Sequence, residues 1–499
     1  MVFSDLFFIF VFIPAFALVY LLATWLDKRI LPKRKASIYY DERATERPAA
    51  ETPAFHARNT ALVIFSLLFY AWGEPIYIFL MLICVLINYL AGLGIAAGQR
   101  RGEGRGAKIW LWIGVICDIL LLGTFKYLGF FNDTFAYLGL DLNAPRLALP
   151  IGISFYVFQS ISYLVDVYRK DAPVQRRYWD LLLYISMFPQ LIAGPIVRYD
   201  KVANEIHNRH VTSEDFADGA YRFFIGLGKK VILSNILSEI VARCLEQGVE
   251  DMSVWGAWLG LVAFALQVYF DFSGYSDMAI GMGRAMGFHF NENFDHPFCA
   301  DSVTDFWRRW HMSLGSFFRD YAYIPMGGNR RHQMLNLLTV WFLTGMWHGA
   351  SWNFIFWGLY FGVILVIEKY AIFPYRRLIP GFIIRIWGLM AVLVSWALFY
   401  FDNFDRMKQW FATAFSSKTQ MNLLEETALT DNFWIWIIAI LLCMPLRRRL
   451  EAFAESRLTG TAGQYTLAAG RATASAIILI LCVALLVGAT NNAFIYTRF

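Results

Sequence analysis

Two histidines, His311 and His348, bracket the stretch of the chain in which polar side chains able to do chemistry are most concentrated. His311 ends the run Phe-Trp-Arg-Arg-Trp-His, and His348 follows an apolar run interrupted only by Thr and Asn. A lone histidine on an apolar face is usually a packed imidazole bonded to a backbone carbonyl. Inside a membrane, however, a titratable side chain is costly and tends to mark a functional site. Gly345 and Gly349 beside His348 would also let a ligand approach the backbone.

The sequence motifs around these histidines are long and specific. Residues 306–330 read FWRRWHMSLGSFFRDYAYIPMGGNR, and residues 343–353 read LTGMWHGASWN. This stretch resembles the membrane-bound O-acyltransferase family, whose signature is an intramembrane histidine corresponding to His348, with a second polar residue upstream corresponding to His311. It looks like the alginate O-acetyltransferase branch, which decorates bacterial exopolysaccharides. The resemblance covers most of the chain and is strongest at 150–169, 188–199, 267–287 and 305–353.

The resemblance implies an O-acetyltransferase of the bacterial inner membrane. It would move an acetyl group from a cytoplasmic donor, acetyl-CoA as a substrate with no bound cofactor, across the membrane. A periplasmic SGNH-type acetyltransferase, or a similar acceptor protein, would complete transfer to an exopolysaccharide such as alginate or cellulose within a synthesis and secretion complex. A transporter of polysaccharide or acyl donor, or an export-complex component without its own catalysis, is the alternative. This alternative explains the membrane composition but not the sequence strings around His311 and His348.

Acyl transfer from a thioester to a hydroxyl needs a base for the hydroxyl proton and stabilisation of the developing oxyanion. We expect His348 to be the general base, and His311 to donate to the thioester carbonyl or to orient the acceptor. The chain has no G-x-S-x-G elbow near a His/Asp pair, which argues against a serine mechanism. Candidates for support or donor binding in the same stretch are Asp305, Trp307, Arg308, Arg309, Asn329 and Trp347.

Two of these candidates, Arg308 and Arg309, would attract the phosphates of a CoA-like donor at the cytoplasmic mouth of the protein. The simpler interpretation of such arginines is the excess of basic residues in cytoplasmic loops.

The tail at 491–499 also has two interpretations. It ends in F-x-Y-x-x-F and is predicted to emerge on the outer face. Tyr496 is either an interfacial aromatic anchor or, as the resemblance implies for polymer-acylating members, an acyl carrier.

Composition sets the class of protein. Of the 499 residues, 58% are hydrophobic, 18% aromatic and only 16% charged, which is outside the range of soluble domains. We therefore predict an all-α, polytopic integral membrane protein with roughly 11–13 helices, including broken or re-entrant segments, around a central funnel. The net charge is +6, and the basic residues lie mainly in short loops between spans, so no nucleic-acid partner is expected. Membrane lipid is expected to surround the chain. The six cysteines show no C-x-x-C spacing and are expected to be structural thiols.

The spans follow one another closely, so we predict a single transmembrane domain over 1–499 with an extracytoplasmic tail. The basic loops place both termini in the periplasm. The predicted spans are 6–26, 60–72, 75–97, 109–125, 147–168, 254–283, 334–349, 352–370, 382–401, 432–446 and 474–490. A moderately polar helix is expected at 221–245, and 127–140 is left open between a partial span and an interfacial segment. Pro189 and Gly194-Pro195 predict a helix broken at membrane depth.

Two aspartates in a membrane span also need partners. Asp271 and Asp277 are too far round a helix to form one carboxylate pair, and a metal site that adds His289 has poor spacing support. No metal site is therefore predicted. We expect an ion pair with Arg284, or a hydrogen bond to backbone freed by Gly274.

Overall fold

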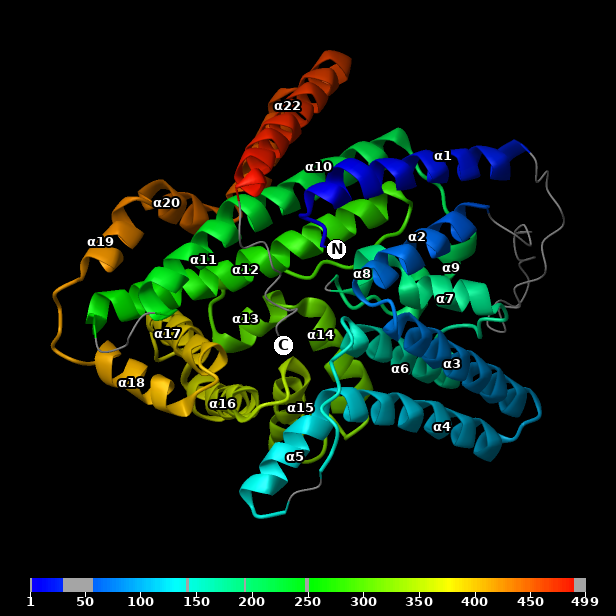
Figure 1. Ribbon diagram of the computed structural model, residues 1–499, viewed down its shortest axis with the longest axis horizontal. Coiled ribbons are helices and arrows are strands. Elements are labelled where there is room, and N and C mark those ends of the chain that lie inside the picture. Colours follow the sequence, from blue (N-terminus) through cyan, green and yellow to red (C-terminus); the bar gives the residue numbers. More distant parts are fainter. Residues whose placement is uncertain (1, 30–56, 141–142, 193, 247–250, 489–499) are drawn as a thin grey trace. The chain divides into compact units, whose positions relative to one another are not determined.

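The computed structural model describes residues 2–29, 57–140, 143–192, 194–246 and 251–488, and these ranges contain helices and no strand (Figure 1). The predicted all-α fold is confirmed. The chain falls into two compact units, one of residues 1–222 with 278–291, the other of 223–277 with 292–499. The single domain, the funnel and the orientation of the termini stay predictions, and the tail at 491–499 lies outside the described residues.

Seven helical stretches in the described ranges are long and apolar enough to cross a membrane, which takes about 20 residues of helix. They are Phe8–Arg29, Tyr77–Arg100, Gly104–Tyr137, Val254–Ala285, Trp352–Tyr375, Gly381–Tyr400 and Gly460–Val487. The spans predicted at 60–72, 147–168 and 334–349 are also helices, of 17, 17 and 16 residues. The protein is therefore a multi-pass membrane protein.

The first unit consists mainly of apolar helices and one broken segment. Its elements are η1 Phe8–Phe12, α1 Ile13–Arg29, α2 Ala57–Gly73, α3 Tyr77–Arg100, α4 Gly104–Leu122, η2 Gly123–Tyr127, α5 Leu128–Tyr137, α6 Ile153–Arg169, α7 Tyr178–Ser186, α8 Phe188–Leu191 and α9 Tyr199–His207. The predicted break is confirmed, because α8 has four residues and 194–197 is buried without helix. In the region left open at 127–140, helix extends as far as Tyr137. No proline interrupts 104–137, so α4, η2 and α5 form one continuous helix.

The second unit carries both histidines. Its elements are η3 Lys229–Ser234, α11 Asn235–Val241, η4 Ala242–Glu246, η6 Pro297–Cys299, α13 Val303–Arg309, α14 Met312–Phe318, η7 Arg319–Tyr323, α15 Gln333–His348, α16 Trp352–Ile367, η8 Glu368–Ile372, η9 Phe373–Tyr375, α17 Gly381–Tyr400, α18 Phe404–Ala414, α19 Leu423–Thr430, α20 Phe433–Leu442, α21 Leu446–Arg457 and α22 Gly460–Val487. Helices α10 Ser213–Gly228 and α12 Val254–Ala285 each begin in one unit and end in the other.

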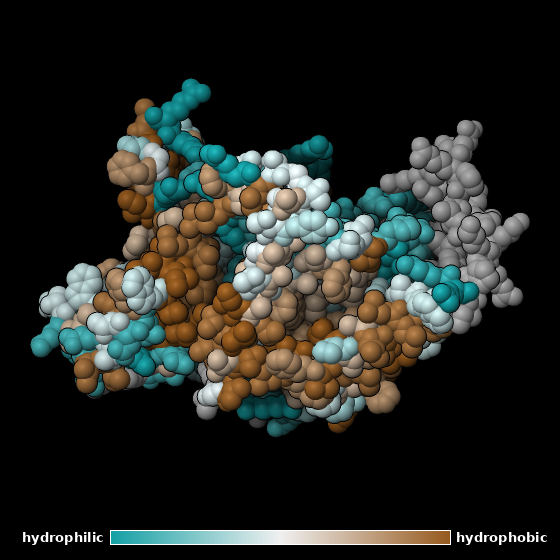
Figure 2. Space-filling view, turned by 90° about the horizontal axis from the view of Figure 1, so that it is seen from above, coloured by the Kyte–Doolittle hydropathy of each residue, from teal (hydrophilic) through white to brown (hydrophobic). Residues whose placement is uncertain are grey.

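Large apolar side chains face outward along the spanning helices. Leu120 on α4 is 63% exposed and Ile480 on α22 is 67% exposed. Hydrophobic surface accordingly covers much of the face shown in Figure 2. An exposed apolar surface of this extent would be a liability in water, but it is the expected lipid-facing surface of a membrane protein.

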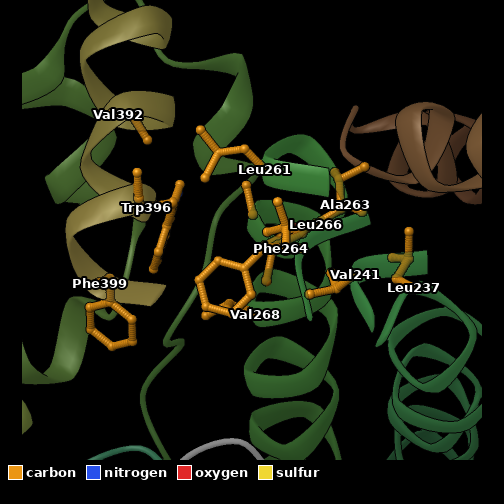
Figure 3. Close-up of a cluster of buried hydrophobic side chains, with 14 of the residues drawn as sticks. Leu237, Val241, Leu261, Ala263, Phe264, Leu266, Val268, Val392, Trp396 and Phe399 are labelled. Atoms are coloured by element: carbon orange, nitrogen blue, oxygen red, sulfur yellow. The ribbon is translucent and has the colours of Figure 1, made fainter. Parts of the chain in front are cut away.

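The core of the second unit is built from aromatic and branched side chains of several helices. Figure 3 shows Trp396 and Phe399 of α17 beside Phe264 and Val268 of α12. The rings of Phe264 and Trp396 meet edge to face with centroids 6.0 Å apart, an arrangement that aromatic pairs favour. This packing provides a rigid support for the residues described below.

The Arg284 partner expected for the two aspartates of α12 was wrong, and the alternative, a hydrogen bond to backbone near Gly274, stays a prediction. Asp271 pairs with Lys230 at 2.8 Å, and Asp277 pairs with Lys229 at 2.7 Å, both across to η3. Arg284 instead contacts Asp215 and Asp218 of α10. The physical reason is the rise of a straight helix, because residues seven apart on it are separated by about 10 Å along the axis. Arg284 therefore finds nearer carboxylates on α10 than Asp277 on its own helix.

Candidate active site

His348 is the last residue of α15, and the close crossing of α15 with α16 positions it. A Cβ on Gly345 would overlap the carbonyl of Phe354, and one on Gly358 would overlap the carbonyl of Trp341. Small residues at this crossing let the two backbones approach, as is common between membrane helices. The approach holds the end of α15, and with it His348, against α16.

Aromatic rings surround His348, which is 4% exposed. Its ring centroid lies 4.9 Å from that of Trp347, 4.8 Å from that of Trp357 on α16 and 5.5 Å from that of Phe399 on α17. Trp357 in turn contacts Trp307 of α13 at 5.6 Å. The imidazole therefore lies in an apolar surrounding from which bulk water is displaced. Electrostatic interactions made there are stronger than in water.

His311 occupies the junction between α13 and α14, in a left-handed backbone conformation with φ 46° and ψ 52°. Such a conformation is uncommon for a residue with a side chain, and its occurrence at a buried polar position is typical of functional sites. The ring is 2% exposed and packs against Phe272 of α12, with centroids 4.6 Å apart. Its centroid is 5.7 Å from that of Trp347. Both predicted histidines therefore contact the same tryptophan.

The ionisation of His311 follows from its burial. Removal from water penalises the charged form and lowers the pKa of His311 to about 3. The imidazole is thus neutral at neutral pH. The ring Nδ1 lies 3.1 Å from Asn293 Oδ1, so a polar side chain holds one edge of the ring.

The predicted supporting residues divide into two groups. Trp307 and Trp347 belong to the aromatic cluster around His348, and Trp307 also contacts Trp341 at 4.7 Å. The others lie where solvent reaches them. Asp305 and Arg309 pair with each other at 3.0 Å across one turn of α13. Arg308 and Asn329 are exposed, and Asn329 accepts a hydrogen bond from the Tyr323 hydroxyl at 2.7 Å.

Sequence reasoning missed two residues that hold this region in place, Asn293 and Glu368. Glu368 follows α16 directly and is fully buried. Its carboxylate accepts hydrogen bonds from the backbone N–H groups of Val303 at 2.9 Å and Thr304 at 2.6 Å, and from the Thr304 hydroxyl. These N–H groups open α13 and would otherwise have no partner in the helix. The sequence feature that could have pointed to Glu368 is an acidic residue at the end of a long apolar run.

We expect Glu368→Ala to destabilise the protein by about 2–3 kcal/mol, because it leaves buried N–H donors unsatisfied. Glu368→Gln keeps one acceptor oxygen and should lose less. Thermal unfolding of the detergent-solubilised protein measures both, with Glu426→Ala on the exposed side of α19 as a control. Equal unfolding temperatures for wild type and Glu368→Ala would contradict the capping role.

An all-helical, multi-pass protein with two buried imidazoles in an aromatic surrounding has the features of a membrane-embedded enzyme. Comparison with known proteins then identifies its class. The family model of the membrane-bound O-acyltransferases matches residues 164–407. The chain belongs to the membrane-bound O-acyltransferase family, as the strings around His311 and His348 predicted, and it is an O-acyltransferase.

Several relatives of the chain carry the names of bacterial O-acetylating proteins, and others are named as teichoic acid D-alanyltransferases. It is 40% identical to the probable alginate O-acetylase AlgI of Azotobacter vinelandii over 72% of this chain and 73% of the relative. Identity to the probable alginate O-acetylase AlgI of Pseudomonas syringae pv. tomato is 41%, over 75% and 73%. The peptidoglycan O-acetyltransferase of Helicobacter pylori is 32% identical, over 69% and 71%.

Proposed function

We propose that this O-acyltransferase takes acetyl groups from a cytoplasmic donor, acetyl-CoA, and moves them across the bacterial inner membrane for O-acetylation of an exopolysaccharide such as alginate or cellulose. The names of the three relatives support acetyl as the transferred group and a bacterial polysaccharide as its destination. The observation that carries the proposal is the pair of buried imidazoles, His311 and His348, in contact with the one ring of Trp347.

The two imidazoles can divide the tasks of acyl transfer. A hydroxyl oxygen attacks the thioester carbon, its proton passes to a basic nitrogen, and the carbonyl oxygen becomes an oxyanion that needs a donor. The C–S bond then breaks, and the leaving thiolate takes up the proton. Two neighbouring imidazoles provide an acceptor and a donor for these steps. The aromatic rings around His348 keep water, a competing nucleophile, away from the thioester.

The remaining parts of the proposal concern the donor and the partner. Arg308 is exposed at the surface of α13, where its guanidinium can attract the phosphates of CoA. Arg309 is held by Asp305 and contributes less freely. On the periplasmic side, where both termini lie in this proposal, an SGNH-type acetyltransferase or similar acceptor protein receives the acetyl group. The synthesis and secretion complex of the polysaccharide is the wider assembly.

Tyr496 is the proposed carrier between the membrane enzyme and that partner. We expect the purified protein in nanodiscs, incubated with acetyl-labelled acetyl-CoA, to retain label, and Tyr496→Phe to retain less than about a tenth of it, because no phenolic oxygen is left to esterify. Tyr465→Phe, which alters a phenol 74% exposed on α22, is the matched control and should label like the wild type.

The outcomes of this experiment separate the parts of the proposal. Full labelling of Tyr496→Phe would show that the tail is an anchor and not a carrier. No label on the wild-type protein, together with no acetyl-CoA turnover when a periplasmic partner is added, would contradict acetyl-CoA as donor.

A further inference from the structure

Three tryptophans of the aromatic cluster around His348 carry buried N–H groups without an acceptor. Trp307, Trp357 and Trp396 come from α13, α16 and α17, and their Nε1 atoms have no hydrogen-bond partner among the residues that the structure describes. Buried donors in native proteins are almost always paired, so each exception needs an explanation. A donor whose acceptor belongs to the substrate is one such explanation.

Trp357 is the tryptophan of this set that is placed for a role in the reaction. Its side chain is 1% exposed, and its ring meets that of His348 edge to face with centroids 4.8 Å apart. The other two are joined to His348 through one further ring, Trp307 through Trp357 itself and Trp396 through Phe399. Trp357 therefore lies directly beside the imidazole that we expect to act as the general base.

The surroundings of Trp357 favour a ligand that only accepts hydrogen bonds. The rings of Trp307, Phe361 and Phe399 lie against it, with centroids 5.6, 5.2 and 5.3 Å away. A buried water needs about two to four polar partners, and these three side chains offer one N–H donor and no oxygen or nitrogen acceptor. A thioester carbonyl oxygen needs donors alone, so neighbouring indole N–H groups suit it better than they suit water.

Acyl transfer requires the general base and the oxyanion donor to lie close together. In the tetrahedral intermediate, the attacking oxygen and the former carbonyl oxygen are bonded to the same carbon. A base within hydrogen-bond reach of the first oxygen is therefore near any group that donates to the second. The direct contact between the rings of His348 and Trp357, which come from the neighbouring helices α15 and α16, meets this requirement.

We propose that Trp357 is a catalytic residue of the acyltransferase, whose indole N–H donates to the thioester carbonyl oxygen and stabilises the oxyanion formed there. The inference rests on the proposed function and adds a residue to its site. The acceptor hydroxyl loses its proton to His348 as its oxygen bonds to the acyl carbon, and the C=O π electrons move onto the carbonyl oxygen. When the oxyanion collapses, the C–S bond breaks and the leaving thiolate takes the proton from His348.

Removal of the N–H group alone tests the proposal. β-(3-Benzothienyl)alanine, incorporated at position 357 by stop-codon suppression, has the shape of tryptophan with sulfur in place of N–H. Acetyl-CoA turnover by this variant in nanodiscs should fall about 10²- to 10³-fold, the effect of losing one oxyanion donor. The loss should appear in kcat with KM nearly unchanged, because the donor acts on charge that develops after binding. Trp357→Phe, which also lacks the N–H, should lose at least as much.

The same replacement at position 396 is the matched control. Trp396 is 2% exposed, and its Nε1 likewise has no acceptor in the described part of the chain. Its ring reaches His348 through Phe399, so benzothienylalanine there should leave nearly the full rate. An indole N–H that only faces a neighbouring π system contributes weakly to packing. If this were the role of Trp357 too, both replacements would have equally small effects.

A binding measurement reports on the hydrogen bond itself. In protein labelled with ¹⁵N-tryptophan, the indole N–H resonance of Trp357 is assigned by its loss in Trp357→Phe. It should move on addition of a ketone analogue of acetyl-CoA, in which a methylene group replaces the thioester sulfur. This analogue keeps the carbonyl oxygen but cannot transfer its acetyl group. The indole resonance of Trp396 should stay in place.

The outcomes separate this inference from the function on which it rests. An active wild-type protein whose kcat survives benzothienylalanine at position 357 would overturn the inference and leave Trp357 a packing residue. Equal losses at positions 357 and 396, with a Trp357 resonance that the analogue does not move, would overturn it as well. A wild-type protein that neither turns over acetyl-CoA nor responds to the analogue would instead remove acetyl-CoA as the donor, and the inference with it.

Discussion

Replacement of His348 by glutamine should lower the rate of acetyl transfer by about 10²- to 10⁴-fold, the range for loss of a positioned catalytic group. Glutamine has a similar volume and can occupy the ring-lined position beside Trp357 and Phe399, but it has no titratable nitrogen. The fold should therefore survive while the chemistry is lost. The measurement is turnover of acetyl-CoA by the protein in nanodiscs, with thermal unfolding as a check on folding.

The pairing of His348 with His311 gives this prediction a second test. Residues that act as one unit have strongly non-additive effects. We expect His311→Asn alone to reduce activity severely, and the double variant His311→Asn/His348→Gln to be little worse than either single one. Asparagine suits position 311 because it tolerates left-handed backbone. Strictly multiplicative losses in the double variant would indicate that the two imidazoles act independently.

A matched control is available at the other end of α15. His332 precedes that helix with φ 48° and ψ 40°, a backbone conformation like that of His311, but it is exposed. His332→Asn should therefore keep full activity. A loss there comparable to that in His311→Asn would mean that the backbone conformation, and not the imidazole, is what activity requires.

The second large effect is expected at the buried ion pair of Lys230 and Asp271, whose side chains are 3% and 1% exposed. Removing one partner leaves an uncompensated charge in an apolar interior, which typically costs about 3–5 kcal/mol. Lys230→Met should therefore lower the unfolding temperature strongly or abolish folding. The lost contacts include the hydrogen bond from Lys230 Nζ to Asn235 Oδ1 at 3.1 Å.

The neighbouring pair provides the control for this prediction. Lys229 and Asp277 are 21% and 15% exposed, so solvent screens the charge left by Lys229→Met and the loss of stability should be smaller. The double variant Lys230→Met/Asp271→Leu removes both buried charges and should recover most of the stability lost in Lys230→Met. A double variant as unstable as the single one would show that hydrogen bonding, and not the unpaired charge, dominates.

Hydropathy and helical period are local properties, and they were sufficient for the fold class. Runs of apolar residues predicted the helices Phe8–Arg29 and Gly381–Tyr400, and the prolines at 189 and 195 predicted the broken segment. The nature of 127–140, where the helix runs on to Tyr137, was left open, because a few polar residues in an apolar run do not distinguish a partial span from an interfacial segment. The structure shows that the helix is unbroken from Gly104 to Tyr137.

The sequence by itself determined the class of protein and its family, and it singled out His311 and His348 as candidate site residues, because long strings of matching residues carry that information without any contact. Only the tertiary structure decided which side chains serve them. Asn293 reaches His311, Glu368 caps α13, and the lysines of η3 meet the aspartates of α12 through packing between elements distant in the chain. Such pairings depend on how helices cross, and the spacing of residues along one helix does not give the distance between side chains on different helices.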